Sequence, residues 1–450
     1  MKLAGLSLAT LFLFSTPSLA KTIRLASGER GGVDRQETLT ADGISKQIRI
    51  QFHLKKLQSR NVRGRYTRIQ MDGLPSTSEP GMPSLPFQAI TLNAAASDLR
   101  IAPILGAPVN LSVGAVLPAQ VEPCRCPSPK TPFLDKLESY EAPASGFVIQ
   151  SLGDFRGQPM SRVLLFPHRY NPKTGQLQVY PNARFEISHQ VEAKGVSKSD
   201  QLYDYLVITP RALMGGLANW VEWKRASQGL HFKVQVYEDL GSPNTNALKD
   251  WIHQEYSRAH FHYALMVGGR SQIPQQIVET TTDKATPSDL PYFTFGGSGD
   301  VIPDVLSGRG VADNADSVAR ILRKWMDYEK DQSVVAGWRR EIGIASNEGS
   351  GPSDAEYIRA IQDRFKTAFA SEPIYLFQNS PDSNPNFFNQ QMASGAMWVT
   401  YIGHGSGYQW PSFGTSYGIP EIKAMRNAGA VKPIWIDVAC LNGILEPANA

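Results

Sequence analysis

The sequence predicts an α/β fold with a mostly parallel sheet, preceded by an all-β region. From Tyr203 onward, short apolar segments alternate with stretches of helix length, which is typical of βαβ units with helices on both faces of a sheet. Before residue 200 the segments are short, alternate polar with apolar residues, and are broken by Pro, Gly and Asn, as in Lys46–Leu54. That alternation favours antiparallel strands with one buried face.

The composition is that of a globular protein. The chain has 450 residues, of which 42% are hydrophobic and 19% charged, which suits about two or three domains. The net charge of +4 is small for this length, and no basic run is interleaved with aromatic residues. We therefore expect no nucleic-acid partner.

The first segment, 1–20, is expected to be a secretory signal peptide. Lys2 precedes an apolar run from Leu3 to Phe14, and Ser18 and Ala20 supply small residues before a cleavage site. A membrane anchor is the alternative, but the run is short, and no other stretch approaches a spanning length. The sequence thus predicts bacterial export and a secreted, extracellular location, with no membrane span beyond the signal peptide.

Two further segments follow. Residues 21–200 are expected to form the β-rich region and 201–450 the α/β region. Residues 192–200 are polar without apolar periodicity, so they are a candidate linker and processing site, with Lys194 and Lys198 as basic positions.

The three cysteines agree with export. Cys124 and Cys126 lie in a Pro-flanked loop, and two readings stay open: a strained disulfide between near neighbours, or a bridge to another copy. A metal site would need more ligands nearby. Pairing these two leaves Cys440 as a free thiol.

Two apolar, strand-like segments near the C-terminus each end in one reactive side chain. His404 follows the run from Trp398, and Cys440 follows the run from Ile434. Chemistry in open α/β sheets lies just past the carboxyl ends of strands, and the intervening segment has room for one crossover helix. Adjacent parallel strands would therefore bring imidazole and thiol side by side.

This pair suits nucleophilic catalysis. A neighbouring imidazole can take the proton of a thiol that is otherwise mostly protonated, and the N–H groups of Gly405 and Cys440 could hold an oxyanion. A lone Cys after an apolar run is usually a core residue, and a lone Gly-His-Gly is often a turn. The two together, each at the end of an apolar run, favour catalysis.

These residues resemble a known family. "YIGHGS" and "IWIDVACLNG" are similar to the catalytic segments of gingipain-type cysteine peptidases, which have a caspase-like αβα sandwich, and the likeness covers about 203–443. The resemblance implies that His404 is the general base and Cys440 the nucleophile of a secreted endopeptidase that acts on protein or peptide substrates and is made as a zymogen. Pro80–Pro86 resembles a motif of the family's β-rich propeptides, which cover the cleft, so residues 21–200 are expected to act as an intramolecular inhibitor. A separate β adhesion domain is the alternative.

The resemblance also suggests other site residues. Asp304 lies before a Gly-Arg pair where the family has an acid that orients the imidazole, although the family residue is Glu; an ordinary surface Asp is the alternative. Asp313 or Asp316 lies near the place of the acid that recognises a basic substrate side chain, but acids also favour a helix N-terminus. Trp410 either lines the substrate pocket or packs in the core.

No cofactor is expected to be required. The family binds structural calcium, so a calcium site is an expectation from the resemblance alone, with loop carboxylates such as Asp283, Asp289 and Asp300 as candidates. No EF-hand loop is present.

Two rival functions share these features. One is a sortase or transpeptidase on the same scaffold, which uses the same acyl-enzyme chemistry. The other is a non-catalytic adhesin with a degenerate core, against which the His404 and Cys440 pair argues. Because a strand that carries the nucleophile is seldom the last element of such a domain, we expect the natural protein to continue beyond Ala450, which would leave domain 201–450 truncated.

Overall fold

A computed structural model describes residues 21–443 apart from internal segments. The segments outside the described residues are 29–30, 41–42, 73, 120–133, 135–139, 191–200, 280–284, 298, 331–338, 348–352 and 427–431. The predicted signal peptide, Cys124, Cys126 and the linker with Lys194 and Lys198 therefore lie outside the described residues.

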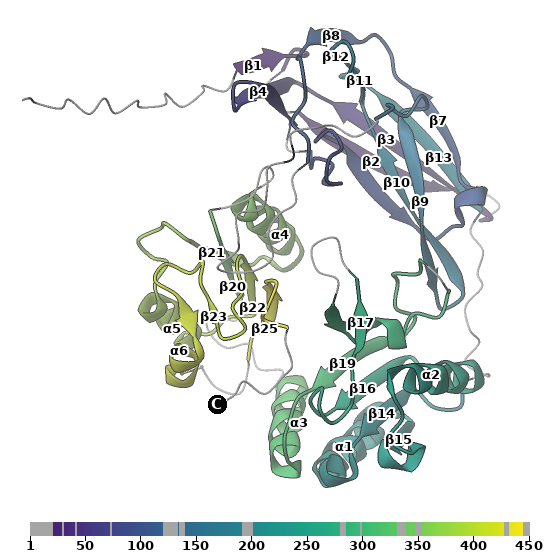
Figure 1. Ribbon diagram of the computed structural model, residues 1–450, viewed down its shortest axis with the longest axis vertical. Coiled ribbons are helices and arrows are strands. Elements are labelled where there is room, and N and C mark those ends of the chain that lie inside the picture. The colour runs from purple at the N-terminus through teal and green to yellow at the C-terminus, as the bar shows by residue number, and fades with distance from the viewer. Residues whose placement is uncertain are drawn as a thin grey trace, which may run out of the picture.

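Antiparallel strands build the N-terminal region (Figure 1). They form four sheets, ordered β1-β4-β5, β6-β10-β9, β11-β12-β8 and β2-β3-β13-β7. One cluster of buried apolar side chains draws on all four sheets, so the expectation of a β-rich region is confirmed. The strands span Lys21–Arg24 (β1), Gly32–Leu39 (β2), Ser45–His53 (β3), Lys56–Val62 (β4), Tyr66–Met71 (β5), Gln88–Leu92 (β6), Arg100–Ile104 (β7), Val109–Ser112 (β8), Phe147–Phe155 (β9), Gln158–Leu165 (β10), His168–Asn171 (β11), Gln176–Val179 (β12) and Arg184–Gln190 (β13).

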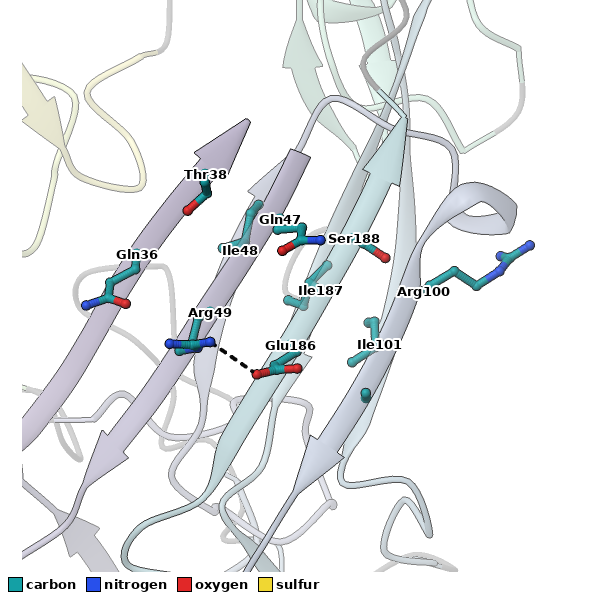
Figure 2. A pocket seen from close by; sticks show the side chains of 11 residues that line it. Gln36, Thr38, Gln47, Ile48, Arg49, Arg100, Ile101, Glu186, Ile187 and Ser188 are labelled. Atoms are coloured by element: carbon teal, nitrogen blue, oxygen red, sulfur yellow. Dashed lines mark ion pairs between the residues drawn. The ribbon is translucent and has the colours of Figure 1, made fainter. Parts of the chain in front are cut away.

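Strand β3 shows why this region forms sheets. Ile48, Ile50 and Phe52 are buried on one face, because side chains alternate along a strand. The opposite face carries polar side chains from neighbouring strands around a shallow hollow of about 420 Å³ (Figure 2). Arg49 and Glu186 face each other there at 3.5 Å, but both are well exposed, so this ion pair contributes little to stability.

The first parallel sheet follows, in the order β15-β14-β16-β19. β14, one of the two inner strands, is apolar on both faces, because helices cover both faces of a parallel sheet. Leu206 and Ile208 pack with α2, whereas Val207 packs with α1 and α3 on the other side. The elements are β14 (Tyr205–Thr209), η3 (Arg211–Leu217), α1 (Ala218–Gln228), β15 (Phe232–Val236), η4 (Glu238–Leu240), α2 (Thr245–Ala259), β16 (Tyr263–Val267), β17 (Gln276–Val278), β18 (Thr286–Ser288), η5 (Leu290–Tyr292), β19 (Leu306–Gly310) and α3 (Ala315–Lys330).

A second parallel sheet has the order β21-β20-β22-β25. Helix α4 lies directly on β20, since a Cβ at Gly343 would come within 2.2 Å of the Ile358 side chain. Helix α5 packs on the opposite face through Phe388 and Met392. The elements are β20 (Arg340–Ala345), α4 (Asp354–Phe369), β21 (Glu372–Phe377), α5 (Pro385–Ala393), β22 (Trp398–Ile402), β23 (Gln409–Trp410), β24 (Tyr417–Gly418), α6 (Ile419–Ala424) and β25 (Ile434–Val438).

The predicted α/β fold with mostly parallel strands is confirmed, and the structure adds that these strands are shared between two sheets. The parallel strands divide into two four-stranded sheets (Figure 1). The chain leaves β19 through α3 and then starts a new sheet at β20 instead of adding a strand to the first. Alternation along the sequence predicts each βα unit, whereas the choice of partner strand depends on contacts between distant residues.

Glu341 is a buried carboxyl on β20. Its residue is 1% exposed, and neither carboxyl oxygen has a hydrogen-bond partner within the described part of the chain. Gln362 of α4 donates to the Glu341 backbone carbonyl at 3.2 Å instead. Burial raises the pKa of the Glu341 carboxyl, and the nearby Ser371 hydroxyl, which is not placed to form a regular hydrogen bond with it, offsets only part of that rise. The folded protein therefore holds this proton more tightly than the unfolded chain does.

We expect the Glu341→Gln variant to change how stability depends on pH. Because the folded protein holds this proton more tightly than the unfolded chain, the free energy of unfolding falls as pH rises from the unfolded pKa of about 4.3 to the higher folded value. Removing the titration should raise the free energy of unfolding at pH 8 relative to the parent and change it little below pH 4. Thermal melting at several pH values measures this. Glu372→Gln, an exposed site on the adjacent strand, is the control, and identical shifts in both variants would contradict the assignment.

Candidate active site

Strands β22 and β25 bring the predicted reactive residues to one edge of the second sheet. The two strands pair in parallel, with Ile402 opposite Val438. His404 and Cys440 each follow two residues later, at the same carboxyl edge. Helix α6 lies in the connection, as the spacing predicts.

The thiol lies against the His404 loop. Cys440 is a free, exposed cysteine, and its Sγ lies 3.8 Å from the backbone oxygen of Gly405. Gly405 is buried there, and a Cβ at this position would come within 2.9 Å of the Ala439 Cβ. A glycine is therefore required for the loop to approach the Cys440 turn this closely.

Hydrogen bonds from below fix the backbone of His404. Its N–H donates to Ser412 Oγ at 3.2 Å, and its carbonyl accepts from the Tyr401 hydroxyl at 2.6 Å. Both partners are 1% exposed or less. The backbone of His404 is therefore held by two buried side chains, whereas His404 itself is only half-buried.

The structure places Asp304 in the loop before β19, a strand of the first sheet. The residue is 2% exposed, and its carboxylate accepts from the backbone N–H groups of Arg156 at 2.5 Å and Phe295 at 3.0 Å. Burial raises the pKa of the Asp304 carboxyl, against the effect of these two donors, and the carboxylates of Asp300 and Asp154 raise it further. Its suggested role of orienting His404 stays a prediction.

The suggested substrate-binding residues lie in different surroundings. Asp313 and Asp316 are exposed at the start of α3, beside the first sheet. Trp410 is buried, stacks on Tyr401 with ring centroids 4.5 Å apart, and donates from Nε1 to Asp437 at 3.0 Å. The burial of Trp410 favours the packing alternative.

Sequence reasoning overlooked three polar residues near this edge. Asp354 accepts a hydrogen bond from the Ser346 hydroxyl, where β20 ends beside β22. Asp437 and Asn442 flank Cys440, and Asn442 Nδ2 donates to Asp437 Oδ2 at 3.0 Å. Asn442 stands within the segment that carries the family likeness, so its nearness to Cys440 was the available signal.

Two of the calcium candidates accept hydrogen bonds from protein groups, and the third lies outside the described residues. Asp289 binds Arg309 through both oxygens at 2.7 Å, and Asp300 accepts from the N–H groups of Gly296 and Ile302. Asp283 is outside the described residues. Over the described ranges no group of three or more His, Cys, Asp or Glu residues is arranged to hold a metal ion. Likewise, none of the described helices is long and apolar enough to cross a membrane.

The fold and the site define an α/β protein with a thiol and an imidazole at neighbouring strand ends. The model of Peptidase family C25 matches residues 198–449, more than half of the chain. The chain therefore belongs to Peptidase family C25.

Its curated relatives are longer proteins. Gingipain R2 of Porphyromonas gingivalis is 27% identical over 333 residues, which cover 65% of this chain and 43% of the relative. Lys-gingipain of the same species is 22% identical over 457 residues, which cover 87% of this chain and 25% of the relative. The chain thus spans less than half the length of these relatives.

Solved structures also match. The crystal structure of the Arg specific cysteine proteinase gingipain R has a TM-score of 0.48 and 25% identity, covering 55% of this chain and 56% of that chain. The complex of the pro- and mature domains of Porphyromonas gingivalis RgpB has a TM-score of 0.48 and 25% identity, covering 54% of this chain and 57% of that chain.

We expect Gly405→Ala to separate the His404 loop from the Cys440 turn. The added Cβ would lie 2.8 Å from Asn442 Oδ1, and such overpacking costs about 1–3 kcal/mol. The alkylation rate of Cys440 and the melting temperature should both fall. Gly443→Ala is the matched control, because no described atom lies within 4 Å of its Cβ. Equal behaviour of the two variants would show that the close approach is unimportant.

Proposed function

We propose that this protein is a secreted cysteine endopeptidase made as a zymogen, with Cys440 as the nucleophile and His404 as the general base. The observation that supports this most is the parallel pairing of β22 and β25, which brings the two side chains to one sheet edge. Membership of Peptidase family C25 supports the same chemistry.

The proposed reaction forms and then hydrolyses a thioester. His404 takes the thiol proton, and Cys440 Sγ attacks the scissile carbonyl carbon. The C–N bond breaks as the imidazolium of His404 protonates the leaving amine. Water, deprotonated by His404, then attacks the thioester, which releases the acid and restores the thiol.

The backbone N–H groups of Gly405 and Cys440 are the proposed oxyanion donors. Backbone donors fixed in this way stabilise the tetrahedral intermediate without reorganising during the reaction. The burial of Gly405 and its contact with the Cys440 turn support a rigid arrangement at this point.

The β-rich region is the proposed inhibitory prodomain. The end of the β9–β10 hairpin packs against the loop before β19: Arg156 Nε donates to the Asp304 carbonyl at 3.1 Å, and Val301 N–H donates to the Leu152 carbonyl at 3.1 Å. Gly153 lies against Asp300 so closely that a Cβ would meet Asp300 Oδ1 at 1.9 Å. The similarity to Lys-gingipain extends over 87% of the chain, and thus into this region.

Turnover of a panel of fluorogenic peptides tests the proposal. Peptides with Arg, Lys, Asp, Asn or Leu before the scissile bond are incubated under reducing conditions with protein cleaved within 191–200. Turnover is expected with the parent and absent in Cys440→Ala and His404→Ala. Turnover that survives Cys440→Ala, or none by any form, would contradict the peptidase assignment.

Two additions separate the rival functions. An added amine that captures the acyl group in place of water would indicate a transpeptidase. Labelling of Cys440 by an electrophilic peptide, lost in His404→Ala, would exclude a non-catalytic adhesin.

In the same cleaved protein, a large loss of kcat in Asp304→Asn would support the predicted orienting role of Asp304.

We expect Arg156→Ala to loosen the β-rich region. The substitution removes the guanidinium bonds to the carbonyls of Asp304 and His262, and bonds from a charged donor contribute about 1.5–3 kcal/mol each. After cleavage within 191–200, the N-terminal piece should bind the remainder at least about tenfold more weakly, measured by its inhibition of peptide turnover. Arg162→Ala, an exposed site on β10, is the control, and unchanged inhibition in Arg156→Ala would rule out this anchor.

A further inference from the structure

A pair of polar side chains beside Cys440 joins the nucleophile turn to the His404 loop. Asn442 lies in the turn after β25, and Asp437 lies within β25. Asn442 Oδ1 accepts from the backbone N–H of Gly407 at 3.1 Å, while its Nδ2 donates to Asp437 Oδ2 at 3.0 Å. The same Asp437 oxygen accepts from Trp410 Nε1 at 3.0 Å.

These bonds tie residues 407–410, the far side of the loop, to β25 and the turn after it, where Trp410 also packs on Trp435 with ring centroids 5.6 Å apart. The near side is fixed by the Gly403 N–H, which donates to the Val438 carbonyl at 3.2 Å, and by the Ser412 hydroxyl beneath His404. Beyond His404, the loop reaches the nucleophile strand through Gly407 and Trp410. The hydrogen bonds that Gly407 and Trp410 donate there both end on the Asp437 and Asn442 pair.

The chemistry of the two partners explains why an amide stands at position 442. A carboxylate requires a donor, and a backbone N–H requires an acceptor. An amide side chain offers both at once, whereas Asp offers acceptors only and Ala offers neither. The carboxylate of Asp437 strengthens both bonds that it accepts, because bonds to an ionised group are stronger than neutral ones.

We propose that Asn442 and Asp437 are positioning residues that hold the imidazole of His404 in register with the thiol of Cys440. Asn442 and Asp437 act through His404 and Cys440 and need not touch substrate. The inference rests on the proposed function for its meaning in catalysis, but the geometry can be tested without peptide turnover.

A double-mutant cycle on the full chain tests the pair. The alkylation rate of Cys440 by iodoacetamide is followed by peptide mass spectrometry from pH 5 to 9, which separates Cys440 from Cys124 and Cys126. We expect Asn442→Ala to slow alkylation at pH 7 by about tenfold, since misplacement by about 1 Å can cost up to a hundredfold. In a His404→Ala background the same substitution should change the rate by less than about twofold, because its effect passes through His404.

Three further variants define the chemistry. Asp437→Ala should behave like Asn442→Ala, whereas Asp437→Asn should stay within about threefold of the parent, because an amide oxygen still accepts both donors. Asn442→Asp should lose rate most at high pH, where its carboxylate repels that of Asp437. Asn386→Ala, an exposed site on α5, is the matched control and should equal the parent.

The outcomes separate this inference from the proposed function. If no peptide is cleaved but the cycle is non-additive, the peptidase assignment fails and the positioning role stands. If Asn442→Ala slows alkylation equally with and without His404, the pair merely supports the fold and the inference is overturned. A parent-like rate and pH profile in Asn442→Ala would overturn it as well.

Discussion

The register between β22 and β25 is the constraint on which the candidate site depends. Because Ile402 lies opposite Val438, the residues two positions later leave the sheet side by side. A slip of one residue would turn every side chain of β25 to the other face. Trp435 would then leave the aromatic cluster it shares with Phe388 and Trp410. The packing that stabilises the second sheet therefore also sets the distance between imidazole and thiol.

The loop before β19 of the first sheet contacts the N-terminal region. Asp304 and its loop accept the turn of the β9–β10 hairpin, while the reactive pair belongs to the second sheet. A carboxyl that is 2% exposed and bonded by two backbone donors is costly to uncover. The hydrogen bonds between the N-terminal region and the Asp304 loop are thus distinct from those described around His404 and Cys440.

Much of this arrangement could be predicted from the sequence. The apolar runs before His404 and Cys440, and the space for α6 between them, were sufficient to predict adjacent strands. Strand β19 is harder to predict from the sequence. Leu306–Gly310 contains two glycines and Arg309, whose side chain is buried, and so lacks the usual apolar pattern. The division into two sheets could not be predicted, since alternation is local and strand pairing is not. The hydrogen bonds of Asn442 could not be predicted either, because its partners Asp437 and Gly407 lie 5 and 35 positions away in the sequence.

The two sheets also have separate hydrophobic cores: Leu206 and Val207 belong to clusters of the first sheet, and Val399 and Tyr401 to a cluster of the second. Substitutions far apart and without shared partners add nearly independently. A lineage could therefore retune how firmly its N-terminal region is retained by altering the β9–β10 hairpin around Arg156, and leave the reactivity of Cys440 untouched. Latency and chemistry would then be separate traits under selection, within a single polypeptide.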